Sequence, residues 1–145
     1  MTVAAILKHK GHDVASVRPT TTVAELARLL SGKRIGAVVV QDAAEQLLGI
    51  VSERDIVHAL AANDTRALDM TAGQLMTRAL KTATLRTTVG EAMTMMTAGR
   101  FRHLPVLDEH GALIGIVSIG DVVKARIMQQ DHEVDSLKAY VAGSV

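Results

Sequence analysis

The chain has 145 residues, 48% hydrophobic and 21% charged, with only two prolines, which is the composition of a folded globular protein. It contains no cysteine, which excludes disulfides, thiol catalysis, iron–sulfur clusters and zinc sites with thiolate ligands. Sixteen Lys and Arg against fifteen Asp and Glu give a net charge of +1, without the positive excess that nucleic-acid binding requires.

An internal repeat organises the sequence. Placing Thr21 on Thr87, an offset of 66 residues, aligns 21–60 with 87–126 without a gap and makes fifteen of the forty positions identical. Upstream the likeness needs a small gap, with Ile6-Leu7 resembling Leu75-Met76. The sequence therefore predicts two copies of one unit, over 1–66 and 67–130, followed by a tail over 131–145.

The predicted elements follow the same order in each copy. A short β-like stretch comes first, and a capping box of threonine and glutamate then predicts a helix start. Two apolar strands around a polar turn follow, and then a second helix near Arg54 or Gly120. In chain order the first four elements are 14–17, the helix from Thr22, 35–40 and 47–51 in one copy, and 81–85, the helix from Thr88, 101–107 and 113–117 in the other. The order is β-α-β-β-α, in the α/β (α+β) class.

Each copy has about sixty residues, so it leaves an apolar sheet face exposed. We expect the two sheets to pack against each other with pseudo-twofold symmetry, and a remaining apolar face to close a homodimer. The tail carries Val134, Leu137 and Val141 at helical spacing beside Tyr140. It is either a helix that caps the core or a dimer contact.

The strongest local identity between the copies joins a strand to a helix. Gly49-Ile-Val-Ser-Glu-Arg-Asp55 matches Gly115-Ile-Val-Ser-Ile-Gly-Asp121. Carboxylate and hydroxyl groups at such a junction can bind a ribose diol, and nearby helix amides favour phosphate. The alternative is local capping, because serine is a good N-cap and aspartate is stable in a first helical turn.

The duplicated motif, together with Arg102-His-Leu-Pro-Val-Leu-Asp108 and the weaker Gly36-Ala-Val-Val-Val-Gln-Asp42, resembles the cystathionine-β-synthase (CBS) domain family. Specifically, the chain looks like a stand-alone tandem pair, or Bateman module. Such modules are regulatory sensors, and many bind AMP, ATP, NAD or S-adenosylmethionine in two clefts between paired sheets. The resemblance implies an adenosine nucleotide as ligand, and a regulated partner protein.

The resemblance assigns one ligand site around Asp121. Ser118 and Asp121 are the expected ribose pair, and Arg102 and His103 would face the phosphates, because an arginine fork suits phosphate oxygens. Small or apolar residues of the first copy would form the opposite wall: Ala15, Ile35 and Gly36. The alternatives are a solvated strand face for Arg100 and Arg102 and a core position for His103.

A second site is expected around Asp55, where Ser52 completes the ribose pair. Gly36 and Ala37 stand where the first site has its basic pair, so Arg54 is the candidate phosphate contact. The facing wall would consist of Lys81, Thr82 and Phe101. We expect the Asp121 site to bind nucleotide better.

Other chemistry is not indicated. No P-loop, Rossmann glycine pattern, nucleophile elbow or histidine cluster with metal-ligand spacing is present, so we expect neither an enzyme nor a metal site. The apolar runs are too short for a bilayer or a signal peptide, which predicts a cytoplasmic protein that binds no membrane. The alternative function is a ligand-free structural or interaction module that docks through its dimer surface or tail.

Overall fold

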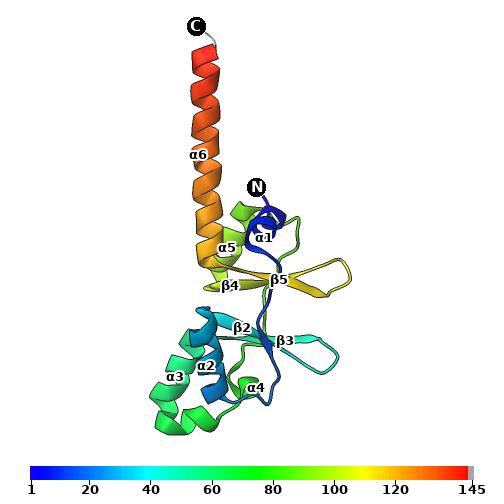
Figure 1. Ribbon diagram of the computed structural model, residues 1–145, viewed down its shortest axis with the longest axis vertical. Coiled ribbons are helices and arrows are strands. Elements are labelled where there is room, and N and C mark those ends of the chain that lie inside the picture. The colour runs from blue at the N-terminus through cyan, green and yellow to red at the C-terminus, as the bar shows by residue number, and fades with distance from the viewer. Residues whose placement is uncertain (144–145) are drawn as a thin grey trace. The chain divides into compact units, whose positions relative to one another are not determined.

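The computed structural model describes residues 1–143 and divides the chain into two compact units. Unit 1 combines residues 1–12 with the chain from Lys81 on, and unit 2 comprises residues 13–80. Each unit contains one small sheet and several helices, which confirms the predicted α+β class (Figure 1).

Unit 2 holds a three-stranded sheet in the order β1-β2-β3. β1 pairs with β2 in parallel, and β2 pairs with β3 in antiparallel. Along the chain the elements are β1 (Ser16–Val17), α2 (Val23–Lys33), β2 (Ala37–Gln41), β3 (Leu47–Ser52), α3 (Glu53–Asn63), the 3-10 helix η1 (Asp64–Asp69) and α4 (Ala72–Leu75).

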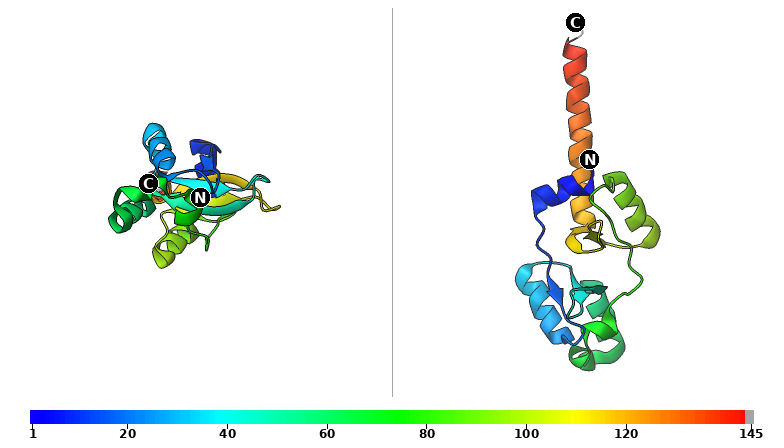
Figure 2. Two further views of the ribbon diagram at one scale, coloured as in Figure 1. Left: turned by 90° about the horizontal axis from the view of Figure 1, so that it is seen from below. Right: turned by 90° about the vertical axis from the view of Figure 1, so that its right-hand side faces the viewer.

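Unit 1 holds an antiparallel pair of strands, β4 and β5. The stretch predicted as a first strand, 81–85, contributes one parallel bridge, from Ala83 to Val106. Helices α1 and α5 lie on either side of the first turns of α6 (Figure 2). The elements are α1 (Val3–Lys10), α5 (Val89–Gly99), β4 (His103–Leu107), β5 (Leu113–Ser118) and α6 (Ile119–Gly143).

The compact units cut across the sequence repeats, because each unit includes the first helix of the other copy: α1 of the first copy lies in unit 1, and α4 of the second copy lies in unit 2. Thr2, just before α1, bridges Thr88 at the start of α5. In the same way Thr71, just before α4, bridges Thr22 at the start of α2. The upstream likeness between Ile6-Leu7 and Leu75-Met76 therefore marks two equivalent helices. The boundaries predicted from the repeat therefore differ from those of the compact units, which follow the packing of the helices.

Two equivalent glycines let these helices approach the sheets. A Cβ on Gly115 of β5 would lie 2.8 Å from Leu7 Cδ1, and a Cβ on Gly49 of β3 would lie 2.8 Å from Met76 Sδ. A Cβ so close to these atoms would force the Leu7 or Met76 side chain to shift. This explains why glycine occupies the same place in both copies.

Each unit has its own apolar core, formed by one face of its sheet and the helices packed on it. The core of unit 1 includes Leu7, Val89, Met96, Leu104, Val117 and Val122. The core of unit 2 includes Val23, Leu26, Leu30, Val38, Val51 and Met76. Aliphatic side chains and methionine thus fill both cores, as the near absence of aromatic residues requires.

The predicted helix starts and turns form as expected. Thr22 Oγ1 accepts a hydrogen bond from the Glu25 amide at 3.3 Å, and Thr88 Oγ1 accepts one from the Glu91 amide at 3.0 Å. In the second hairpin turn, Asp108 Oδ1 accepts from the amides of His110 and Ala112, both at 2.9 Å. The strands shift slightly, since β4 begins at His103 rather than at residue 101.

The tail differs from one of its two expectations. Residues 131–143 continue α6 without a break and are exposed, so they do not cap the core of the chain. Leu137 is 63% exposed and Tyr140 is 74% exposed. The spacing of the apolar residues therefore predicted the helix correctly, but it did not show that the helix packs against the core of its own chain.

None of the helices in residues 1–143 combines the length and apolar character needed to cross a membrane.

Candidate ligand-binding sites

The first candidate site lies where β3 gives way to α3. Asp55 Oδ2 accepts a hydrogen bond from the Ser52 amide at 2.8 Å, and the Asp55 amide donates to Ser52 Oγ at 3.3 Å. The Ser52 hydroxyl also donates to Asp55 Oδ2 at 3.1 Å. This reciprocal capping box fixes both side chains at the start of the helix.

The second candidate site repeats this geometry where β5 gives way to α6. Asp121 Oδ2 accepts from the Ser118 amide at 2.8 Å, and the Asp121 amide donates to Ser118 Oγ at 3.1 Å. The Lys10 ammonium group and the Ser118 amide both donate to Oδ2 of the Asp121 carboxylate. The other oxygen, Oδ1, is therefore available as an acceptor, and capping and ligand binding are compatible at this residue.

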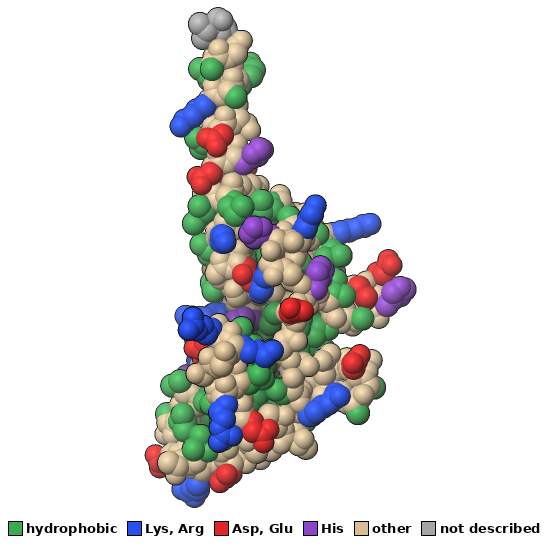
Figure 3. All heavy atoms as spheres, viewed as in Figure 1, with side chains coloured by type: hydrophobic (Ala, Val, Ile, Leu, Met, Phe, Trp, Pro, Cys, Tyr) green, Lys and Arg blue, Asp and Glu red, His purple; other side chains and the backbone are tan. Residues whose placement is uncertain are grey.

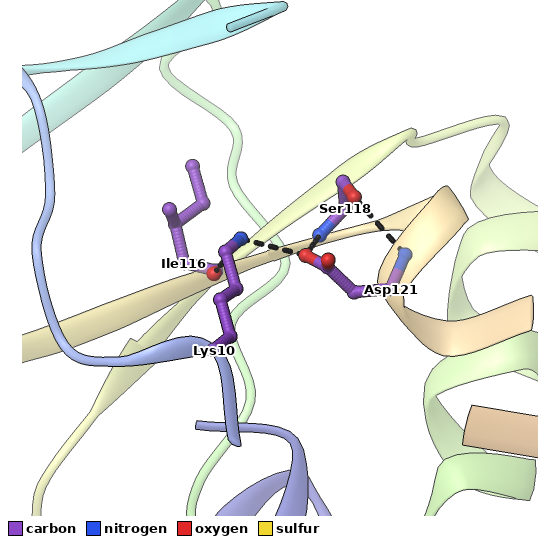
Figure 4. A network of polar contacts seen from close by, with 4 residues as sticks. All are labelled: Lys10, Ile116, Ser118 and Asp121. Atoms are coloured by element: carbon purple, nitrogen blue, oxygen red, sulfur yellow. Dashed lines mark hydrogen bonds and ion pairs between the residues drawn. The ribbon is translucent and has the colours of Figure 1, made fainter. Parts of the chain in front are cut away.

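Lys10 sets the Asp121 site apart. From the end of α1, its ammonium group donates to Asp121 Oδ2 at 2.6 Å and to the Ile116 carbonyl at 2.9 Å (Figure 4). The two side chains of this ion pair are 34% and 25% exposed. Asp55 has no such cation: in the described part of the chain, the ion pair formed by a lysine or arginine is Lys10–Asp121.

The environment keeps Asp121 ionised. Burial by itself raises the pKa of its carboxyl group, but the hydrogen bond and charge of Lys10 and the hydrogen bonds from Ser118 outweigh burial and hold the pKa below its usual value. At neutral pH the carboxylate is thus a hydrogen-bond acceptor only, the form that binds the two hydroxyl groups of a ribose.

The basic pair predicted for the phosphates lies beside this junction. His103 is directly opposite Ser118 in the β4–β5 register, and the Arg102 carbonyl accepts from the Ile119 amide at 2.7 Å. The Arg102 side chain is exposed, and His103 is half-buried. Arg100 is not on a strand face, because it forms the C-cap of α5 with a φ of 57°.

The equivalent positions in unit 2 carry no charge. Ala37 pairs with Ser52 in the β2–β3 register, and the Gly36 carbonyl accepts from the Glu53 amide at 2.9 Å. Ala37 is buried, whereas Arg54 on the first turn of α3 is exposed. The two junctions thus have the same backbone geometry. They differ in charge, because Gly36 and Ala37 stand where the other junction has Arg102 and His103.

The predicted wall residues belong to the opposite unit in each case. Ala15, Ile35 and Gly36 are half-buried residues of unit 2, while Asp121 belongs to unit 1. Lys81 and Thr82 are exposed residues of unit 1, and Phe101 of the same unit is half-buried and packs against its core. Their contribution to the two sites stays a prediction.

Sequence reasoning missed Lys10. The residue lies 111 positions from Asp121 in the chain, and α1 itself was not predicted. One signal pointed to α1: the likeness between Ile6-Leu7 and Leu75-Met76, which showed that a short segment precedes each copy. That signal could place a helix but not the lysine at its end.

Within residues 1–143, no three His, Asp or Glu side chains are grouped so that they could hold a metal ion. The polar groups of the two junctions cap helices, and Asp121 also pairs with Lys10. Their chemistry suits a ligand with hydroxyl and phosphate groups.

Comparison with known proteins identifies the family. The family model described as CBS domain matches residues 4–62 and 72–128. The chain therefore belongs to the CBS-domain family and carries two CBS domains in tandem, as the repeat and its motifs predicted.

Two similar proteins match most of the length of this chain. The structure of the CBS-domain containing protein ATU1752 from Agrobacterium tumefaciens is 44% identical, with a TM-score of 0.84 over 87% of this chain and 99% of that one. The mitochondrial CBS domain-containing protein CBSX3 of Arabidopsis thaliana is 36% identical over 98% of this chain and 72% of its own length. Three curated relatives, CBSX3 included, are matched over 57% to 72% of their length.

Two similar structures contain adenosine ligands. The CBS domain protein PAE2072 from Pyrobaculum aerophilum, complexed with AMP, is 28% identical with a TM-score of 0.74, over 83% of this chain and 89% of that one. The CBS domain pair of protein MJ0100, in complex with 5-methylthioadenosine and S-adenosyl-L-methionine, is 25% identical with a TM-score of 0.79, over 89% and 98%. An adenosine group is common to these three ligands.

Proposed function

We propose that this protein is a regulatory module that binds an adenosine nucleotide, such as AMP, ATP or NAD, and transmits its occupancy to a partner protein without catalysing a reaction. The observation that carries the proposal is the ionised Asp121 at a strand–helix junction, with one carboxylate oxygen available and a basic pair alongside. The adenosine ligands of two similar CBS structures support it.

Each residue near Asp121 has a part in this proposal. Asp121 and Ser118 bind the ribose hydroxyls, and Lys10 keeps the carboxylate ionised and in place. Arg102 and His103 bind the phosphates, since both lie beside the same junction. Asp55 and Ser52 have the same ribose geometry but no basic pair, so their site binds more weakly.

Regulation requires that the nucleotide bind two arrangements of the module with different affinities, because a ligand shifts an equilibrium only by that difference. We propose a homodimer as the regulated assembly, acting in the cytoplasm on a protein partner. The relative CBSX3 is named as a mitochondrial protein. Fractionation of the source cells would therefore test whether this protein is in the cytoplasm.

The experiment is a thermal-shift panel with AMP, ADP, ATP, NAD, NADH and S-adenosylmethionine on protein stripped of nucleotide. A ligand present at a hundred times its Kd stabilises the native state by about 2.7 kcal/mol, which raises the unfolding midpoint by several degrees. We expect at least one nucleotide to raise the midpoint in the wild type and in Asp55→Ala, but not in Asp121→Ala.

Asp55→Ala is the matched control, because it removes the same capping interaction from the other unit. Each variant is compared with its own midpoint without ligand, so that the loss of a cap is not counted as loss of binding. If no nucleotide shifts the wild type at millimolar concentration, the proposal is wrong.

A second candidate function is an interaction module without ligand, favoured by the exposed apolar residues of α6. It predicts no thermal shift with any nucleotide, and capture of a partner that is lost when residues 131–145 are removed.

A further inference from the structure

The last three turns of α6 carry large apolar side chains that are exposed. Val134 is 50%, Leu137 63% and Val141 56% exposed. In Figure 1 this part of α6 extends beyond the other elements of unit 1. Helices in proteins are stabilised mainly by the packing of an apolar face. A surface of this kind indicates a partner.

The spacing of the apolar residues identifies the kind of partner. Ile127, Val134 and Val141 are seven residues apart and take position a of a heptad. Leu137 then takes position d, Gln130 takes the preceding d, and Val123 the one before. We call these six residues the α6 seam. A seven-residue apolar repeat is the pattern of a coiled coil. β-branched residues at all three a positions, with leucine at one of the three d positions, favour two parallel strands.

The charges beside the α6 seam select a second copy in parallel orientation. Positions e and g flank a seam, and in a parallel pair a residue at g meets the residue five positions later, at e, on the other helix. Arg126 at g would meet Asp131, and Glu133 at g would meet Lys138. Both contacts join opposite charges, and twofold symmetry repeats each of them.

The remaining positions agree with this arrangement. Positions opposite the α6 seam carry polar or small residues, namely His132, Ser136 and Ala139. Figure 3 shows hydrophobic side chains alternating with acidic and basic ones along α6. When the two helices are in register, the two Gln130 side chains meet, and their amide groups can form hydrogen bonds with each other. A polar residue in a seam fixes register at a cost in stability.

We infer that the α6 seam, from Val123 to Val141, forms a parallel two-stranded coiled coil with the same segment of a second copy. The inference specifies the surface of the homodimer in the proposed function, and it is independent of the nucleotide. A nucleotide-dependent change in unit 1 that moves the base of α6 would thereby reach the second copy.

The first test measures mass in solution by size-exclusion chromatography with light scattering. We expect the wild type at about twice the chain mass of 15.4 kDa and Leu137→Glu at the single-chain mass. The matched control is Ser136→Glu, which adds the same charge to the neighbouring residue outside the seam and should remain a dimer. A Leu137→Glu protein that stays dimeric would overturn the coiled coil while leaving the homodimer in place.

The second test measures orientation, and it uses the absence of cysteine from the chain. Ile127→Cys should form a disulfide-linked dimer under mild oxidation, because a parallel, in-register pair brings the two residues 127 together. His132→Cys, on the outer side of the helix, should not. In an antiparallel pair the two residues 127 lie near opposite ends, so failure of Ile127→Cys to cross-link would overturn the parallel arrangement.

The third test concerns the charges. Glu133→Lys places two lysines together in the parallel pair and should weaken the dimer at least several-fold, and Lys138→Glu in the same chain should restore it. An unchanged dimer in Glu133→Lys would contradict the proposed register.

Discussion

Replacing Lys10 by methionine tests how the Asp121 site is held together. The change keeps most of the side-chain stem but removes the ammonium group, and with it the hydrogen bonds to Asp121 at 2.6 Å and to the Ile116 carbonyl at 2.9 Å. A buried charged hydrogen bond stabilises a protein by about 1.5 to 3 kcal/mol, and an exposed ion pair by about 0.2 to 1 kcal/mol. Because the two side chains are 34% and 25% exposed, we expect a loss of about 1 kcal/mol and a fall in the unfolding midpoint of about 3 °C.

The pH dependence of this loss separates the ion pair from packing. The folded-state pKa of Asp121 is lowered, so its contribution is fully present above the ordinary carboxyl pKa of about 3.9 and is lost as the pH falls through the lower folded value. Urea unfolding of the wild type and Lys10→Met should therefore differ most at pH 7, and less at pH 3. Lys8→Met, on the same helix, is the control and should unfold as the wild type does.

Equal stability of Lys10→Met and the wild type at pH 7 would refute this reasoning. A difference that stayed constant from pH 7 to pH 3 would show that Lys10 acts through its apolar stem.

Three further substitutions test the fold that positions the site, each by urea unfolding. Leu7→Ala should cost about 3 kcal/mol, because Leu7 is fully buried in the core of unit 1; a loss below 1 kcal/mol would show that α1 is not firmly packed there. Gly49→Ala should cost about 2 kcal/mol, because a Cβ would lie 2.8 Å from the Thr77 carbonyl oxygen, whereas Gly90→Ala in α5 meets no such obstacle and should not destabilise. Thr88→Ala should cost about 1 kcal/mol through loss of the α5 cap, while Thr97→Ala, exposed on the same helix, should be nearly neutral; equal effects would contradict the capping role.

The repeat made much of the fold predictable. An offset of 66 residues aligned the elements of the two copies, and the caps at Thr22 and Thr88 located both helix starts because capping is a local interaction. The strand–helix junctions were equally local, so the sequence located the capping pairs Ser52–Asp55 and Ser118–Asp121. Their role in ligand binding stays a prediction.

The parts that were missed depend on contacts distant in sequence. The placement of α1 and α4 depends on the bridges Thr2–Thr88 and Thr22–Thr71, which join residues far apart in the sequence. The Lys10–Asp121 pair follows from the placement of α1 and spans 111 positions. The stretch 81–85 was expected as a strand, but it makes only the bridge at Ala83, since strand length depends on its neighbour as well as its own residues. The exposed tail was ambiguous because an apolar helix face does not specify what it packs against.

The measurement that tests the central claim most directly is a calorimetric titration of nucleotide-stripped protein with AMP, repeated on Asp121→Asn. The asparagine keeps the size of the side chain but removes the charge that the ribose hydroxyls are proposed to meet, and the loss of a charged hydrogen bond corresponds to about 1 to 3 kcal/mol, or roughly five- to 150-fold in Kd. The account predicts saturable binding to the wild type that weakens by at least about fivefold in Asp121→Asn and changes little in Asp55→Asn. Equal affinity for AMP in the wild type and in folded Asp121→Asn would contradict it.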